Sequence, residues 1–97
     1  MFARLGIWHG SPEEIGQWIK RGSEQVKPEL AATLGLKAAY WLADRASGTG
    51  MIVTLWESEA AMQASEAERL KRQSVMSAVT GANVRTERYE VVDALIR

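Results

Sequence analysis

Short apolar runs alternate with segments of helical periodicity along this chain. Four runs have the composition of β-strands, and they lie at residues 2–8, 36–43, 51–56 and within 84–96. Between the first two runs, one helical stripe of apolar residues consists of Ile15, Trp18, Ile19, Gly22 and Val26. A second helical region is expected from Ser58 to about Val79. Its apolar residues form no single stripe, which predicts a break near Ser65.

The start of the first helix carries the strongest local signal. Ser11 is a good N-cap, Pro12 suits the first helical position, and Glu14 stands where a capping box needs a carboxylate. Pro28 is expected to kink or restart the helix, because proline lacks the amide that a helix interior uses. Gly35 is the expected C-terminal stop.

The order of the elements predicts the fold. It is β-α-β-β-α-β within 97 residues, a length that suits one domain over residues 1–97. Two strand-helix-strand units in this order predict an α+β, ferredoxin-like sandwich. In that fold the first and third strands lie in the middle of the sheet. The third run, MIVTLW, is the most apolar, and the last, VRTERYEVV, is the most polar, which agrees with a central and an edge position.

Alternation along the third strand bears on assembly. One side of that strand carries Met51, Val53 and Leu55, and the other carries Ile52, Thr54 and Trp56. Both faces of the sheet are therefore largely apolar, whereas two helices cover only one of them. We expect a second copy of the chain to cover the other face, which predicts a homodimer with two sheets packed face to face.

Composition narrows the classes of function. Lysine plus arginine and aspartate plus glutamate number 12 each, so the chain lacks the basic surface that nucleic acid or anionic lipid would need. Cysteine is absent, which excludes disulfides, thiolate metal sites and a cysteine nucleophile. No His/Asp/Glu cluster has metal-ligand spacing, and no apolar segment reaches the length of a membrane span. We expect a cytoplasmic protein with no metal and no nucleic-acid partner.

Trp56 stands where the third strand changes into an acidic, alanine-rich segment. It is either the last core residue before a Ser58 N-cap or an aromatic wall that stacks on a flat substrate. His9, the only histidine, ends the first strand and is either a general base or an exposed loop residue. Both alternatives stay open for each residue.

The edge strands carry phenols and guanidinium groups. Tyr40 on the second strand and Arg85 on the last are candidates to hold a phenolate or enolate oxygen through hydrogen bonds. The alternative is cross-strand pairing on a solvated edge, and the sequence ERYE is typical of such a ladder.

The stretch LWESEAAM, with the strand and helix order around it, resembles the antibiotic biosynthesis monooxygenase (ABM) superfamily of dimeric α/β barrels. The resemblance covers nearly the whole chain. It implies a ferredoxin-like protomer, a homodimer and a pocket between each sheet and its own helices. It also implies a cofactor-independent monooxygenase that converts small aromatic or polyketide-like phenols and anthrones into quinones, with the substrate supplying the electrons.

The resemblance also assigns roles. Trp56 matches the pocket tryptophan of the quinone-forming enzymes, whereas their pocket asparagine falls near Ile52 and is absent. The catalytic set that we predict is His9 as base, Trp56 as stacking wall, and Tyr40 or Arg85 as oxyanion partner. The residues disfavour the haem-degrading branch, because the first strand lacks its asparagine and an approximate alignment puts Ser65 and Val75 at the places of its tryptophan and histidine.

Other functions share this topology. A non-catalytic domain that binds a small ligand or serves a structural role is the main alternative, and its mark would be a core filled by Trp18, Trp56 and Met62. An RNA-binding domain would need a basic face, which this neutral chain lacks. A regulatory amino-acid-binding domain also has this topology, although such domains are usually attached to an enzyme.

Overall fold

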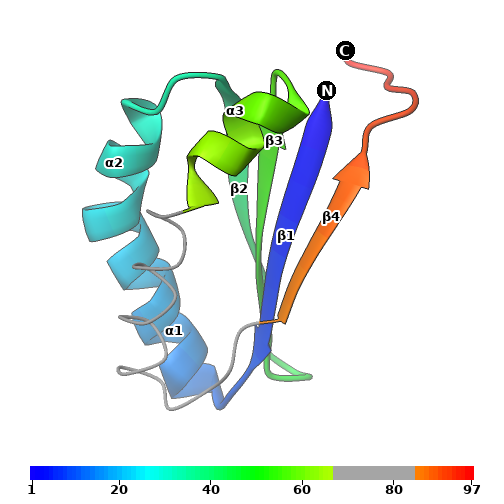
Figure 1. The fold of residues 1–97 in the computed structure, drawn as a ribbon. Helices are drawn as coiled ribbons and strands as arrows, with labels where there is room; N and C mark the ends of the chain where they lie inside the picture. Colours follow the sequence, from blue (N-terminus) through cyan, green and yellow to red (C-terminus); the bar gives the residue numbers. More distant parts are fainter. Residues whose placement is uncertain (67–84) are drawn as a thin grey trace.

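A four-stranded antiparallel sheet, covered on one face by helices, organises the protein (Figure 1). The computed structural model describes residues 1–66 and 85–97. Along the chain the elements are β1 (Phe2–His9), α1 (Pro12–Arg21), the π-helical turn η1 (Gly22–Val26), α2 (Lys27–Ala31), β2 (Leu36–Asp44), β3 (Thr49–Trp56), α3 (Glu59–Ala64) and β4 (Arg85–Glu90).

The strand order β2-β3-β1-β4 confirms the predicted ferredoxin-like α+β fold. β1 and β3 lie in the centre, and β2 and β4 lie at the edges, as the polarity of the strands indicated. In the central pair, Phe2 lies opposite Trp56 and His9 lies opposite Thr49. β4 is shorter than the run that predicted it, because the strand ends at Glu90.

The helical layer begins as the sequence predicts. The Ser11 hydroxyl accepts from the Glu14 amide at 3.2 Å, and the Glu14 carboxylate accepts from the Ser11 amide at 2.8 Å, which completes the capping box. Pro28 lies in the first turn of α2, so the helix restarts there as expected. The chain widens into the π-helical turn η1 just before this proline, a common way to absorb a break in a helical hydrogen-bond ladder.

Two glycines occupy positions that a larger side chain would disturb. Gly22 lies against the Trp41 indole, where a Cβ would overlap Nε1, so η1 can approach β2 only with glycine at this position. Gly48 has a φ of 71° in the turn between β2 and β3, a conformation that side chains disfavour. Asp44 supports the same turn, since its carboxylate accepts from the Ala46 and Ser47 amides.

The two sides of the sheet differ in their cover. The helix-facing side packs on α1, η1 and α2 around a buried cluster of Trp8, Ile15, Trp18, Val26 and Leu30. The other side, which we call the open face, carries no described helix (Figure 1). By register and alternation the open face consists of Ala3, Leu5, Ile7, Ala38, Tyr40, Leu42, Met51, Val53, Leu55, Arg85, Glu87 and Tyr89. The predicted division of β3 into two faces is thus confirmed.

Helix α3 follows β3 directly. Ser58 is its N-cap, with its hydroxyl accepting from the Ala61 amide at 3.1 Å. The helix ends at Ala64, which confirms the break expected near Ser65. The expected continuation to Val79 falls on residues 67–84, outside the described residues.

Candidate functional site

Four site residues were predicted from the sequence, and three of them, His9, Tyr40 and Arg85, lie on or beside the open face. Tyr40 is in β2 and more than half exposed, and Arg85 begins β4 and pairs with Glu87 of its own strand at 3.4 Å. His9 is exposed at the end of β1, where its Nδ1 lies 3.2 Å from the Thr49 hydroxyl. Within ERYE, Glu87 pairs with Arg85 of its own strand and Arg88 pairs with Glu66, so neither of these ion pairs joins two strands.

Trp56 lies on the opposite side and at the opposite end of the sheet. Its side chain is fully buried on the helix-facing side. His9 is level with Thr49, the first residue of the eight-residue strand that Trp56 ends, so the two are separated by roughly 23 Å along the sheet. Within one protomer, His9, Tyr40 and Arg85 do not meet Trp56, and the four residues do not form a single site.

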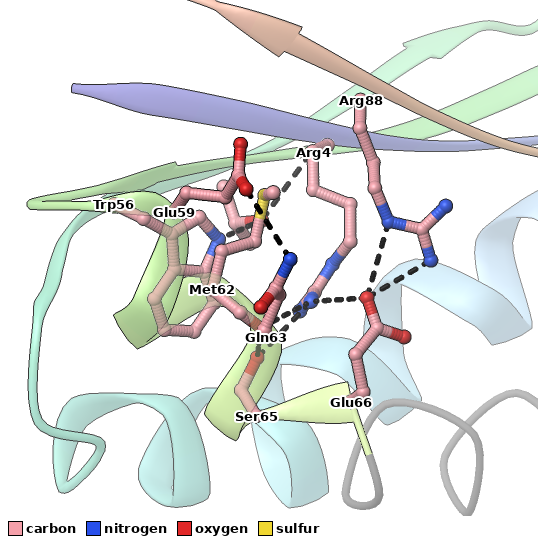
Figure 2. Close-up of polar contacts among 9 residues, drawn as sticks. Arg4, Trp56, Glu59, Met62, Gln63, Ser65, Glu66 and Arg88 are labelled. Carbon is pink, nitrogen blue, oxygen red and sulfur yellow. Dashed lines mark hydrogen bonds and ion pairs between the residues drawn. The ribbon is translucent and has the colours of Figure 1, made fainter.

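Arg4 is the central side chain of the cluster around Trp56 (Figure 2). It is only 4% exposed, although it carries a charge and lies in the middle of an apolar strand. Its guanidinium carbon lies 5.1 Å from the centre of the Trp56 ring, a cation–π distance. Its Nη1 donates to the Met62 carbonyl at 3.2 Å and to the Ser65 hydroxyl at 3.0 Å. Arg4 thereby ties the C-terminal end of α3 to the sheet.

The Trp56 N–H belongs to the same cluster. It donates to the Thr54 hydroxyl at 2.9 Å, and that hydroxyl donates to the Arg4 carbonyl at 3.2 Å. With one side of the indole facing a guanidinium and its N–H paired, Trp56 is held as a core residue. Stacking a substrate on this ring would require α3 to move.

Glu66 extends the cluster to the edge strand. One carboxylate oxygen, Oε1, accepts from Arg88 Nε at 3.1 Å and from Arg88 Nη2 at 2.9 Å. The same oxygen lies 3.5 Å from Arg4 Nη1. Arg4 and Arg88 are cross-strand partners in register, so this single oxygen lies between two guanidinium groups (Figure 2).

The buried indole of Trp8 is a second unusual side chain on the helix-facing side, besides Arg4. Its indole meets Trp18 edge to face, with ring centres 5.6 Å apart. The side chain is 2% exposed, and its Nε1 has no hydrogen-bond partner in the described structure. Buried N–H groups are nearly always paired in native proteins, so this donor calls for an acceptor.

Two groups outside these clusters have shifted pKa values. The Tyr89 hydroxyl donates to Glu87 Oε1 at 3.1 Å, and this hydrogen bond, strengthened by the charge of the carboxylate, raises the pKa of Tyr89. Hydrogen bonds from the Ser47 backbone and hydroxyl lower the pKa of Asp44. Both groups are exposed, so neither shift indicates a site.

Among residues 1–66 and 85–97, no group of three or more His, Asp or Glu side chains is placed to hold a metal ion. None of the helices in this part of the chain is long and apolar enough to cross a membrane.

Solved structures with the same arrangement of elements are numerous. The ActVA-Orf6 monooxygenase of Streptomyces coelicolor, solved with the ligand Nanaomycin D, superposes with a TM-score of 0.83 at 13% identity, over 99% of this chain and 91% of that chain. SnoaB, a cofactor-independent oxygenase from Streptomyces nogalater, gives 0.70 at 12% identity, over 99% and 97%. A dimeric ferredoxin-like protein from an uncultured marine organism gives 0.75 at 17%, over 99% and 98%.

The chain has the fold of the ABM monooxygenases. The structures confirm the fold that the resemblance implied. They show no more than the fold, because the sequence identities are 17% or lower. Neither models of protein families nor curated protein sequences gave a match.

Ile52 and Trp56 lie on the same side of the sheet. Both lie on the helix-facing side, where the resemblance expects a pocket asparagine and tryptophan. Ile52 packs against the buried cluster, so an apolar side chain fills the place expected for the amide. Arg4 is the residue of the cluster around Trp56 that the sequence analysis missed. The signal was available, because Arg4 alternates in phase with Trp8 in the strand FARLGIW.

Replacing Arg4 tests whether the cluster holds the fold together. We expect Arg4→Met to lower the free energy of unfolding by about 2–3 kcal/mol, because Ser65 and the Met62 carbonyl lose a buried charged donor. Arg88→Met removes a guanidinium from the same carboxylate but at a 44% exposed side chain, so it should cost no more than about 1 kcal/mol. Urea unfolding followed by circular dichroism measures both. Equal losses would contradict a central role for Arg4.

Proposed function

We propose that the protein is a cofactor-independent monooxygenase that binds a small aromatic, polyketide-like substrate between the sheet and its helices. The observation that carries the proposal is the unpartnered, buried Nε1 of Trp8 on the helix-facing side. A carbonyl or phenolate oxygen of a flat ligand would supply the missing acceptor. The fold shared with proteins described as a monooxygenase and a cofactor-independent oxygenase supports the same conclusion.

The surroundings of Trp8 suit an aromatic ligand. Trp18 and Trp41 belong to or border the same buried cluster, and aromatic and apolar walls are typical of small-molecule sites. Gly6 lies two residues before Trp8, on the same side of β1, and has no side chain to fill the space above the strand. Glycine inside a strand often marks a place where a ligand approaches the backbone. We place the substrate over this strand.

The reaction class follows from a substrate that supplies its own electrons. A methylene group and dioxygen give a carbonyl group and water: the methylene carbon loses four electrons, one oxygen atom enters the product, and the other leaves with the two methylene hydrogens as water. The first step is loss of a proton, which gives a delocalised anion. The Arg4 charge on the helix-facing side of β1 would favour that anion and lower the pKa of the bound substrate. The roles of His9, Tyr40 and Arg85 stay predictions, because these residues lie on or beside the open face.

Oxygen uptake by the purified, metal-free and flavin-free protein tests the proposal against anthrones and dihydroxynaphthalenes. We expect uptake above the uncatalysed rate and a roughly tenfold lower kcat/KM for Trp8→Phe, which keeps a ring but removes the N–H. Trp18→Phe makes the same change in a wall ring of the proposed site, so a larger loss in Trp8→Phe than in Trp18→Phe would isolate the contribution of the unpartnered N–H. A folded protein with no uptake across the panel, or Trp8→Phe with wild-type kinetics, would refute the proposal.

A non-catalytic ligand-binding or structural domain is the second candidate. It is favoured by the burial of Trp18, Trp56 and Met62, each no more than 4% exposed, because these side chains fill much of the described layer between sheet and helices. Binding of an anthrone in calorimetry, with no oxygen uptake and no product by mass spectrometry, would support this alternative.

We also propose that the protein is a homodimer joined through the open face. Apolar residues make up most of that face, and Tyr40, Leu42 and Tyr89 are each about half exposed. Two similar structures are described as dimeric ferredoxin-like proteins. A second copy would remove this apolar surface from water.

A further inference from the structure

We propose that Arg4 and Arg88 form a binding site for an aromatic carboxylate, and that Glu66 occupies this site until the ligand displaces it. The proposal rests on the proposed function only in placing the ligand on the helix-facing side of the sheet. It adds a substrate class: a flat molecule that carries a carboxylate.

The pairing of strands sets up the site. Arg4 and Arg88 lie directly opposite each other on β1 and β4. Like charges in this position repel, so the arrangement favours an anion shared by both. Glu66 is that anion in the present structure, and it is the described carboxylate that contacts both guanidinium groups.

Glu66 fits the two arginines unequally. Its Oε1 makes hydrogen bonds of 2.9 and 3.1 Å to Arg88 but lies 3.5 Å from Arg4 Nη1. Charge-assisted N–H···O bonds are shorter, at about 2.7–2.9 Å. Glu66 is held by the backbone just after α3, whereas a free carboxylate can move closer to Arg4. A ligand can therefore pair with both arginines better than Glu66 does.

The Glu66–Arg88 pair is open to water. Its side chain is 26% exposed and that of Arg88 is 44% exposed, and solvent-exposed ion pairs contribute weakly to stability. Arg4 in contrast is 4% exposed, so an anion that reaches it is shielded from water and attracted strongly. The site thus combines a replaceable occupant with a buried charge.

Trp56 explains the preference for an aromatic anion. Its ring lies under the Arg4 guanidinium at 5.1 Å, and Met62 covers the neighbouring surface as part of α3 (Figure 2). α3 has six residues and is held at its C-terminal end by the Arg4 bonds to Met62 and Ser65. A ligand that takes over Arg4 would loosen this end of the helix and could place a ring beside Trp56.

The test measures binding of 2-naphthoate and of its uncharged analogue 2-naphthamide by titration calorimetry. A site that its own side chain blocks binds more weakly in proportion to the fraction of time it is free. We expect Glu66→Gln to bind 2-naphthoate about tenfold more tightly than the wild-type protein does, with no change for the amide. Arg88→Gln should weaken naphthoate binding about tenfold. Glu59→Gln makes the same substitution on α3 at an exposed position and controls for the general loss of negative charge.

The possible results separate the carboxylate site from the oxygenase. Unchanged naphthoate affinity in Glu66→Gln, equal tightening for the amide, or equal tightening in Glu59→Gln would overturn the proposal. Charge-dependent naphthoate binding in a protein that consumes no oxygen would uphold the carboxylate site and count against the oxygenase. Oxygen uptake together with naphthoate binding that is unchanged in Glu66→Gln and Arg88→Gln would overturn the carboxylate site and support the oxygenase.

Discussion

Trp56→Ala is expected to lower the free energy of unfolding by about 3–5 kcal/mol. The side chain is fully buried, Arg4 lies over its ring, and its N–H is bonded to Thr54, so truncation opens a cavity and leaves a buried hydroxyl without its donor. Domains of this size are stable by only about 5–15 kcal/mol. The loss would consume a large part of that margin and should be visible as a lower urea midpoint.

Two further variants make the result specific. Trp56→Phe keeps most of the ring but removes the N–H, so it should lose less than the alanine variant. Leu34→Ala removes an apolar side chain that is 91% exposed and should stay within about 0.5 kcal/mol of the wild-type protein. A loss below about 1 kcal/mol in Trp56→Ala would show that the indole contributes little to packing. It would then favour the role of Trp56 as a wall of the binding site.

The sequence predicted the architecture well because the signals for it are local. The capping box at Ser11, the restart at Pro28 and the apolar run of β3 each depend on a few neighbouring residues. The order of the elements then left one common topology, and the observed sheet order agrees with it. Among the described elements, some ends shifted, as with β4, which stops at Glu90.

The candidate site was predicted less well because it depends on which strand positions face the helices. His9, Tyr40 and Arg85 were chosen for their chemistry, yet register places them on or beside the open face and away from Trp56. Arg4 was overlooked because one charged residue in a strand is usually solvent-facing. Only the pairing of β1 with both neighbours, and α3 above it, shows that this arginine is buried.

Trp8 illustrates a further limit of sequence analysis. Alternation places Trp8 on the same side of β1 as Arg4 and Gly6, but the sequence alone does not show which side faces the helices. The structure shows both its burial and the lack of a partner for its N–H among the described residues. An unmet hydrogen bond is a property of the packed core, so no pattern of residue types could have predicted it.

Val53→Lys is expected to convert the proposed homodimer into a monomer. Val53 lies in the middle of the open face, with Tyr40 of β2 on one side and Leu5 of β1 on the other. A lysine at this point would have to enter the interface without a partner, and a buried unpaired charge is costly. We expect the dissociation constant to rise at least about 100-fold, which corresponds to roughly 3 kcal/mol.

Light scattering after size-exclusion chromatography at micromolar concentration gives the mass of each variant. Gln17→Lys adds the same charge at an exposed position on α1 and should remain a dimer. Circular dichroism of the Val53→Lys monomer should resemble that of the wild-type protein, because Val53 is only partly buried within a protomer. A wild-type chain that runs as a monomer would end the argument from the open face. A dimer that survives Val53→Lys would place the interface elsewhere and leave the exposed Tyr40 and Leu42 side chains in need of another explanation.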